Sequence, residues 1–404
     1  MIGVLIRRNI WRNRRRTLIT MASVTFAVLL AVTMKSLQNG VFEKLVEDMV
    51  GYYTGYLQLH LRGFHEEQSL DNSMPFDALL LDAVEGTENI RAAVPRLESF
   101  MLSASGTTTR GCMLIGTVPE AENRMSGLER RMVSGRYFRK EAKEVVLAEK
   151  LAQKLGLTPG DTMVLLGQGY QGITAAGKFT VCGIVHFGTP SLNEALVFMP
   201  LSACQELIGT GSRITSLAVS IEDTDRLYST REVLGLRVGT PYEVITWKEM
   251  LPDIDNHIRS DAANFYLFFG VLYILIAFGM FGTVLMMLNE RRYELGILLA
   301  IGMSRVRVAA LLAGETVLIA LIGALAGVLI SLPVVFYLSE YPIRFRGSMA
   351  EAYSRFGFEP VWPASLDGEI FLVQTLIVLA IAILVSVYPC LAVWRLQAVK
   401  SIRR

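Results

Sequence analysis

The chain has 404 residues, of which 52% are hydrophobic and only 19% are charged, and its mean hydropathy is +0.41. This composition excludes a single water-soluble globule with an ordinary polar surface and predicts a membrane protein. The formal net charge is only +2, from 39 Lys and Arg against 37 Asp and Glu, so the overall charge gives no indication of a nucleic-acid partner.

Four apolar segments are long enough to cross a membrane, which takes about 20 helical residues. We predict transmembrane helices at residues 17–40, 261–288, 309–339 and 370–394. The sequence MKSLQNG after the first apolar run lacks a small-residue cleavage pattern, which favours an uncleaved signal anchor over a cleaved signal peptide. The uncharged stretch 262–288 would measure about 40 Å as a helix against roughly 30 Å of hydrocarbon, so we expect it to tilt or to project as a stalk.

Basic residues beside the spans predict the topology, because Lys and Arg resist translocation. Acid-free basic clusters precede the first span (Arg7, Arg8, Arg12, Arg14, Arg15, Arg16) and follow the last one (Arg395, Lys400, Arg403, Arg404). We therefore expect both termini in the cytoplasm, including the segment 1–16 and the tail 395–404. The loop 289–308 should then also be cytoplasmic, and the segments 41–260 and 340–369 should lie on the opposite face.

Residues 41–260 are numerous enough to form a separate domain with its own core. TGYLQLHL at 54–61 alternates as a strand does, and the segment 143–161 reads as a short strand, a helix and a Gly-Leu-Thr-Pro-Gly stop. KFTVCGIVHF and EALVFMP have the β-branched and aromatic residues typical of strands. The expected fold is a four-helix membrane protein with a large α+β domain inserted between helices 1 and 2.

The search for catalytic chemistry gives one formal match, GQGYQG at residues 167–172, which fits the dinucleotide pattern G-x-G-x-x-G. That motif must open a helix, whereas here a strand-like segment follows, so a Gly-rich hairpin tip is the preferred interpretation. His60 and His65 are too few for a zinc site, and the four cysteines have no metal-ligand spacing. We expect no catalytic residue, no metal site and no cofactor on this chain.

Small residues in the third span indicate close helix packing. Gly323 and Gly327 form a G-x-x-x-G motif, which lets another helix approach, either within the chain or from another copy, and a substrate path along this face is the alternative. Glu315 near the start of the same span is costly in hydrocarbon, so we expect it to snorkel or to pair, with Arg305 or Arg307 as candidate partners.

The loop NERRYELGILLAIGMSRVRV at 289–308 places charges between two apolar spans. Together with the basic segment RRNIWRNRRRT at 7–17, and with VVLAEKLAQKLGLTPGD and KFTVCGIV, it resembles the FtsX-like, or type VII, permeases of ABC exporters. The four-span layout is similar to the lipoprotein-releasing permeases LolC and LolE, and less to the macrolide-exporter (MacB) type with its fused ATPase. Within the family's external domain, a β-rich insert is expected at about 120–200.

The resemblance implies a bacterial inner-membrane protein that works as a dimer with a second copy or a homologue. A dimer of cytoplasmic ATPases would bind ATP and Mg²⁺, and the cargo would be lipoproteins or other amphiphiles from the membrane. MacB-like efflux of small molecules or peptides, motion transmitted to a periplasmic partner without transport, and a membrane receptor without any ATPase remain alternatives.

Two sets of site residues follow. The loop 289–308 is expected to dock the ATPase as a coupling helix, with Leu295, Leu298 and Leu299 adding an apolar face; a loop that only fixes topology is the alternative, which the interleaved acids disfavour. By resemblance, its signature positions are Glu290, Arg291, Arg292, Glu294, Gly296, Ala300 and Gly302.

The hairpin tip, with Gln168, Tyr170 and Gln171, is a candidate contact for a periplasmic carrier or adaptor, and a tip without a partner is the alternative.

Overall fold

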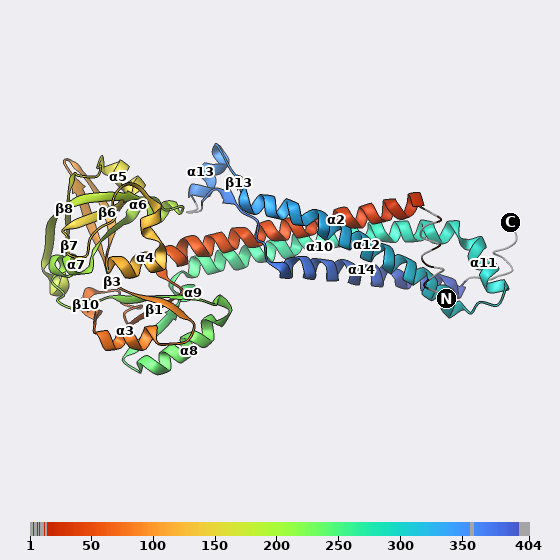
Figure 1. Ribbon diagram of the computed structural model, residues 1–404, viewed down its shortest axis with the longest axis horizontal. Coiled ribbons are helices and arrows are strands. Elements are labelled where there is room, and N and C mark those ends of the chain that lie inside the picture. Colours follow the sequence, from red (N-terminus) through yellow and green to blue (C-terminus); the bar gives the residue numbers. More distant parts are fainter. Residues whose placement is uncertain are drawn as a thin grey trace. The chain divides into compact units, whose positions relative to one another are not determined.

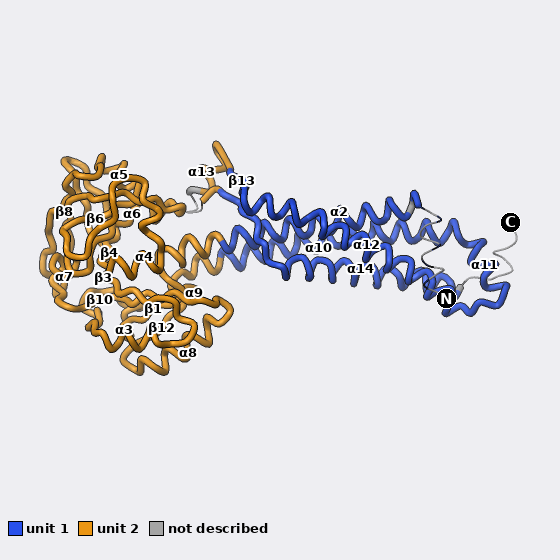
Figure 2. The backbone as a smooth tube through the Cα atoms, viewed as in Figure 1, with its two compact units in different colours: residues 1–43, 257–344, 361–404 blue, residues 44–256, 345–360 orange. Residues whose placement is uncertain are grey.

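A computed structural model of the chain describes residues 3, 6, 8, 12, 14–355 and 359–395. Most of the expected segment 1–16, and the expected tail beyond residue 395, lie outside the described residues. The chain divides into two compact units (Figure 2). The helical unit comprises residues 1–43, 257–344 and 361–404, and the α/β unit comprises residues 44–256 and 345–360.

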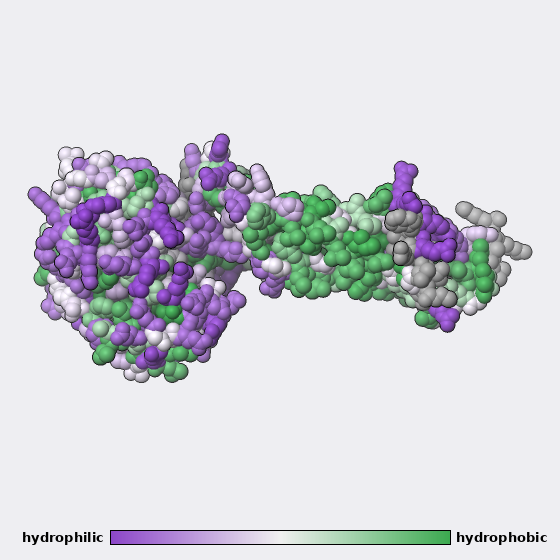
Figure 3. Space-filling view, in the orientation of Figure 1, coloured by the Kyte–Doolittle hydropathy of each residue, from purple (hydrophilic) through white to green (hydrophobic). Residues whose placement is uncertain are grey.

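The helical unit contains the membrane spans. Within the described residues, four helices are long and apolar enough to cross a membrane: α2 (Arg14–Val46), α10 (Pro252–Glu290), α12 (Arg305–Glu340) and α14 (Gly368–Arg395). On the face that Figure 3 shows, apolar side chains cover the middle of this helical unit, as hydrocarbon contact requires. At 39 residues, α10 is about 58 Å long, well beyond the bilayer's roughly 30 Å of hydrocarbon. This length supports the stalk interpretation.

The four helices pack around a core of small and β-branched side chains. This core includes Val24, Val28 and Val32 of α2, Ile276, Met280 and Val284 of α10, Ala320 and Ala324 of α12, and Val378 and Ala382 of α14. The short helix α11 (Arg292–Ala300) joins α10 to α12. Beyond α12, strand β13 (Ile343–Arg344) pairs antiparallel with β14 (Val361–Trp362), where the chain returns towards α14.

The α/β unit alternates short helices and strands. In chain order its elements are η1 (Glu47–Thr54), β1 (Leu57–Leu61), η2 (Leu70–Asn72), β2 (Met74–Pro75), α3 (Ala78–Glu85), β3 (Ile90–Ser105), β4 (Thr108–Thr117), α4 (Pro119–Ser126), η3 (Leu128–Arg131), β5 (Met132–Gly135), β6 (Glu144–Ala148), α5 (Glu149–Leu155), β7 (Thr162–Gln168), η4 (Tyr170–Gly172), β8 (Thr174–Val185), α6 (Pro190–Ala195), β9 (Leu196–Pro200), α7 (Leu201–Ile208), β10 (Arg213–Ile214), β11 (Ser216–Ile221), η5 (Thr224–Arg226), α8 (Leu227–Val238), β12 (Tyr242–Thr246), α9 (Trp247–Met250) and α13 (Ser348–Arg355).

Ten of these strands form one mixed sheet in the order β12-β1-β11-β3-β4-β9-β6-β8-β5, with β7 pairing to β3 and β8. The long strand β3 (labelled in Figure 1) joins the part of the sheet that contains β11 to the part that contains β4. Its first part, Ile90–Arg96, pairs with β11, and its second part, from Arg96 onward, pairs with β4. The strands between residues 120 and 200 therefore continue the same sheet through β4 and β9 rather than forming a separate one.

A buried ion pair lies where β3 changes partners. The side chain of Arg96 is fully buried, and its guanidinium donates to both carboxylate oxygens of Glu122 on α4, at 3.0 and 2.7 Å. It also donates to the carbonyl oxygen of Tyr53 in η1. Burial raises the pKa of the neighbouring Glu98 carboxyl, which Arg96 opposes. The pair therefore ties η1, the sheet and α4 together.

We predict that Glu122→Ala destabilises the α/β unit by about 3–5 kcal/mol, because it removes the carboxylate that both pairs with the buried Arg96 charge and accepts its hydrogen bonds, leaving only Glu98 at 3.8 Å. The apparent melting temperature of the purified protein measures this effect. The double variant Arg96→Met/Glu122→Leu should recover most of the loss, since it removes both charges. Equal melting temperatures for wild type and Glu122→Ala would contradict the assignment.

Candidate functional site

The charged segment 289–308 forms a helix–turn–helix connection at one end of the helical unit. Helix α10 ends at Glu290, Arg291 leaves the helical conformation at φ −97° and ψ 5°, and α11 begins at the next residue. After α11 the chain turns at Gly302, whose φ of +99° only glycine adopts without strain. Ser304 is extended, and α12 starts directly after it. The sequence thus fixes a short helix between two turns.

A buried ion pair holds the first turn. Nη1 of Arg291 lies 2.5 Å from Oε2 of Glu315 on α12, and the two residues are 5% and 2% exposed. The prediction that Glu315 pairs with Arg305 or Arg307 is therefore wrong, and Arg291 is not part of an exposed docking face. The physical reason is that a carboxylate near the start of a span needs a close cationic partner, and the Arg291 turn lies beside α12.

Glu294 on α11 extends this network. It accepts from Nε of Arg291 at 3.3 Å and lies 2.5 Å from Nη2 of Arg12 in the basic N-terminal segment. Glu294 and Arg12 are both about half exposed, so this pair contributes well under 1 kcal/mol. The Arg12–Glu294 pair matters for position rather than for stability, because it holds Arg12 next to α11.

The apolar residues of α11 face inward. Leu295 is fully buried, and Leu298 and Leu299 pack against a cluster that includes Met287 and Val308. Gly296 is also buried. The expectation that these leucines offer an apolar face to a partner is wrong for Leu295, because closing the turn between α10 and α12 already buries it, whereas Leu298 and Leu299 are only partly buried against the same cluster.

The outward surface consists of other residues, which we call the coupling surface: Glu290, Arg292, Tyr293, Ile301 and Val306. Tyr293 is 54% exposed, Ile301 78% and Val306 63%, and Ala300 and Gly302 are exposed beside them. Exposed apolar side chains among charges, with Tyr and Arg present, are typical of protein docking surfaces. Tyr293, Ile301 and Val306 lie outside the positions predicted for this site, although large apolar residues beside charged ones are visible in the sequence.

Arg305 has a separate role at this end. Its guanidinium donates to the carbonyl oxygen of Trp394, in the last described turn of α14. A cation at a helix C-terminus satisfies an orphan carbonyl group and favours the helix dipole. Arg305 therefore links the start of α12 to the end of α14.

The G-x-x-x-G face of α12 packs against α2 of the same chain. A Cβ added at Gly323 would lie 2.9 Å from Cβ of Val24, and one at Gly327 would lie 2.7 Å from Cβ of Val28. Thr25 donates its hydroxyl to the Gly323 carbonyl at 3.0 Å. This face is thus occupied by an internal helix contact.

Residues 167–177 form the predicted hairpin connection, since β7 and β8 pair antiparallel from Gln168–Thr174 onward. Strand β8 follows the Gly-rich motif, so the helix that a pyrophosphate would need is replaced by a strand. The tip folds back onto the unit instead of projecting freely. Gly169 packs against Ile208, where an added Cβ would lie 2.5 Å from the carbonyl oxygen, and the Gln171 N–H donates to Asp71 at 3.0 Å.

Tyr170 is half-buried in this tip, with the Arg213 guanidinium 5.6 Å from its ring centroid. Its ring is thus already engaged within the unit. Gln168 and Gln171 are exposed. Of the three residues expected to contact a partner, the two glutamines have the more accessible side chains.

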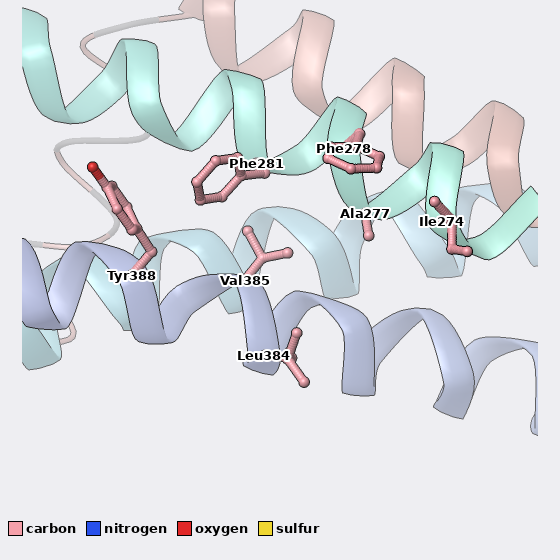
Figure 4. Close-up of a pocket in the computed structure, with 7 residues that line it drawn as sticks. All are labelled: Ile274, Ala277, Phe278, Phe281, Leu384, Val385 and Tyr388. Carbon is pink, nitrogen blue, oxygen red and sulfur yellow. The ribbon is translucent and has the colours of Figure 1, made fainter.

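An apolar groove of about 580 Å³ opens between α10 and α14 (Figure 4). Its lining consists of Ile274, Ala277, Phe278, Phe281, Leu384, Val385 and Tyr388. The aromatic rings of Phe281 and Tyr388 contact each other edge to face, with their centroids 5.0 Å apart, and close one end of the groove. Such a lining suits hydrocarbon and offers a polar solute almost nothing to bind.

We predict that Arg291→Leu strongly reduces the yield of folded, monodisperse protein, because it removes the cation that lies 2.5 Å from the buried Glu315 carboxylate, at a cost of about 3–5 kcal/mol. The double variant Arg291→Leu/Glu315→Leu should restore most of the yield, measured by size-exclusion chromatography. Arg292→Leu, at the exposed neighbouring position, is the matched control and should behave like wild type. If Arg291→Leu matches that control, the pair does not hold the turn.

Comparisons with known proteins cover the whole chain. Residues 17–234, more than half of it, match the family model of the MacB-like periplasmic core domain, and residues 266–398 match that of the FtsX-like permease C-terminal region. The lipoprotein-releasing system transmembrane protein LolC of Xylella fastidiosa is 22% identical over 421 residues, covering 100% of this chain and 98% of that protein. The macrolide export ATP-binding/permease protein MacB of Aggregatibacter actinomycetemcomitans is 24% identical over 334 residues, covering 79% of this chain and 50% of that protein.

Among solved structures, the periplasmic region of MacB from Actinobacillus actinomycetemcomitans matches with a TM-score of 0.37 and 20% identity, over 53% of this chain and 98% of that one. The family models and the relatives agree with the four apolar helices and the inserted α+β domain described above. The chain therefore belongs to the FtsX-like, type VII, permeases of ABC transporters.

Proposed function

We propose that this permease subunit couples ATP hydrolysis by a separate ATPase to movement of its α/β unit in the periplasm, and so releases lipoproteins or other amphiphiles from the inner membrane. The observation that supports this cargo best is the LolC similarity, which extends over nearly the full length of both chains. The ATPase dimer would bind the ATP and Mg²⁺, and the permease would pair with a second copy or a homologue.

The charge distribution supports the orientation. The coupling surface and the acid-free basic clusters lie at the same predicted face of the membrane, and basic flanks favour the cytoplasm. In this orientation the ATPase meets the coupling surface, and the α/β unit lies in the periplasm.

The coupling surface suits ATPase docking for a physical reason. Ile301 and Tyr293 can insert into a pocket of a soluble partner, and Glu290 and Arg292 can set the orientation through complementary charges. Because Arg291 pins α11 to α12 through Glu315, a displacement of α11 is passed to a membrane helix rather than lost in a flexible loop.

The membrane helices support an amphiphilic cargo. Hydrocarbon is the natural occupant of the groove between α10 and α14, whether it comes from a lipid, from a cargo acyl chain or from a partner helix. MacB-like efflux of a small molecule or peptide is the second candidate, favoured by the match to MacB proteins. The third candidate function is to pass motion to a periplasmic partner without transporting any cargo.

We predict that Ile301→Asp weakens co-purification of the ATPase at least about tenfold, since a buried unpaired charge at an interface costs more than 1.4 kcal/mol. Leu236→Asp on α8, a leucine that is 87% exposed in the α/β unit, is the matched control and should leave the ATPase bound. Wild-type ATPase recovery with Ile301→Asp would show that α11 is only a topological connection.

The cargo is tested with the permease and its co-purified ATPase in proteoliposomes. We expect ATP-dependent release of a triacylated fluorescent lipoprotein to an added carrier, and none with a catalytically dead ATPase. ATP-dependent export of a dye or macrolide without lipoprotein release would favour the MacB-like alternative. ATP hydrolysis without lipoprotein release and without export of the dye or macrolide would favour a permease that only passes motion to a periplasmic partner.

A further inference from the structure

The chain between α12 and α14 makes an unusually close contact with α2. A Cβ added at Gly40 would lie 2.8 Å from the carbonyl carbon of Pro363 and 2.8 Å from the amide nitrogen of Ser365. Both atoms belong to the backbone, so no side-chain rearrangement could relieve such a contact. The backbone of residues 363–365 therefore lies directly on α2, and glycine is the residue that permits it.

Hydrogen bonds fix the same contact one turn away. The Ser365 N–H donates to the Ser36 carbonyl at 2.9 Å, and the Ser36 hydroxyl donates to the Ser365 carbonyl. The Ser365 hydroxyl donates to Glu43 at 2.7 Å. Ser36 and Ser365 are almost fully buried. These bonds thus use backbone groups of an irregular segment that would otherwise be unsatisfied.

A further set of contacts lies within the α/β unit. Nζ of Lys44 lies 2.7 Å from Oδ1 of Asp48 and 3.8 Å from Oε2 of Glu359. The same Glu359 oxygen approaches Gly188, in the loop between β8 and α6, where an added Cβ would lie 2.6 Å from it. Residues 36, 40 and 44 are each four apart, so one face of α2 receives the whole segment.

We propose that residues 359–365, which we call the strap, clamp the start of α14 to α2, and that Gly40 is the positioning residue that allows it. Through the strap, α2 and α14 move as one body, so displacement of the α12–α14 pair reaches α2. The transmission step rests on the proposed function, whereas the clamp itself does not.

Gly40→Ala tests the clamp, because alanine favours helix more than glycine does and any loss must come from the added Cβ. Hydrogen exchange of the Ser365 amide in the full-length protein should accelerate at least about tenfold. Gly282→Ala on α10 is the matched control, since an added Cβ there has no neighbour within 4 Å. Unchanged Ser365 exchange in Gly40→Ala, with the control also unchanged, would overturn the clamp without involving any ATPase or cargo.

A disulfide between Ser36→Cys and Ser365→Cys tests whether the strap stays closed during the cycle. Once formed by oxidation, it should leave ATP-driven release of the labelled lipoprotein unchanged, while Gly40→Ala lowers that release at least about tenfold relative to Gly282→Ala. Release that stops on oxidation and returns on reduction would overturn the one-body proposal, because the strap would then have to open. If wild type itself shows no release, the proposed cargo fails, and the hydrogen-exchange result for Gly40→Ala still decides the clamp.

Discussion

The arrangement of the candidate site depends on one electrostatic constraint: a carboxylate near the start of a membrane span must have a cationic partner. Glu315 meets this constraint through Arg291, at the turn between α10 and α11. That pairing sets the direction of α11, which then turns its leucines inward and leaves Tyr293 and Ile301 outside. The exposure of Tyr293 and Ile301 is therefore a consequence of satisfying a buried charge.

A second constraint acts towards the other end of the spans. Buried backbone polar groups must be hydrogen-bonded, so an irregular segment that packs against a helix must bond to its neighbours. The strap does so through Ser36 and Ser365, and Gly40 provides the space. The α11 turn and the strap each connect a membrane helix to its neighbour by buried, short-range contacts. Rigid connections of this kind pass on displacement, whereas flexible loops absorb it.

The sequence predicted the spans, the inserted domain and the hairpin well, because each depends on local hydrophobic pattern and turn chemistry. It failed where a contact joins distant residues. The partner of Glu315 lies 24 residues earlier, and the neighbour of the hairpin tip, Asp71, lies 100 residues before Gln171. Likewise, the pattern of α11 shows that leucines share a face but not whether that face meets the core or a partner. Gly40 gave no signal at all, since a lone glycine in an apolar helix has many explanations.

The central claim is that ATPase action on the coupling surface moves the α/β unit relative to the membrane. Energy transfer from a donor on Thr107→Cys, exposed at the turn between β3 and β4, to labelled lipid headgroups in a nanodisc measures this movement directly. With the ATPase added at equal concentration to both, trapping by ATP and vanadate should change the transfer efficiency for the wild-type coupling surface and leave it unchanged for Ile301→Asp. Equal efficiencies with and without trapped nucleotide in the wild-type complex would contradict the account.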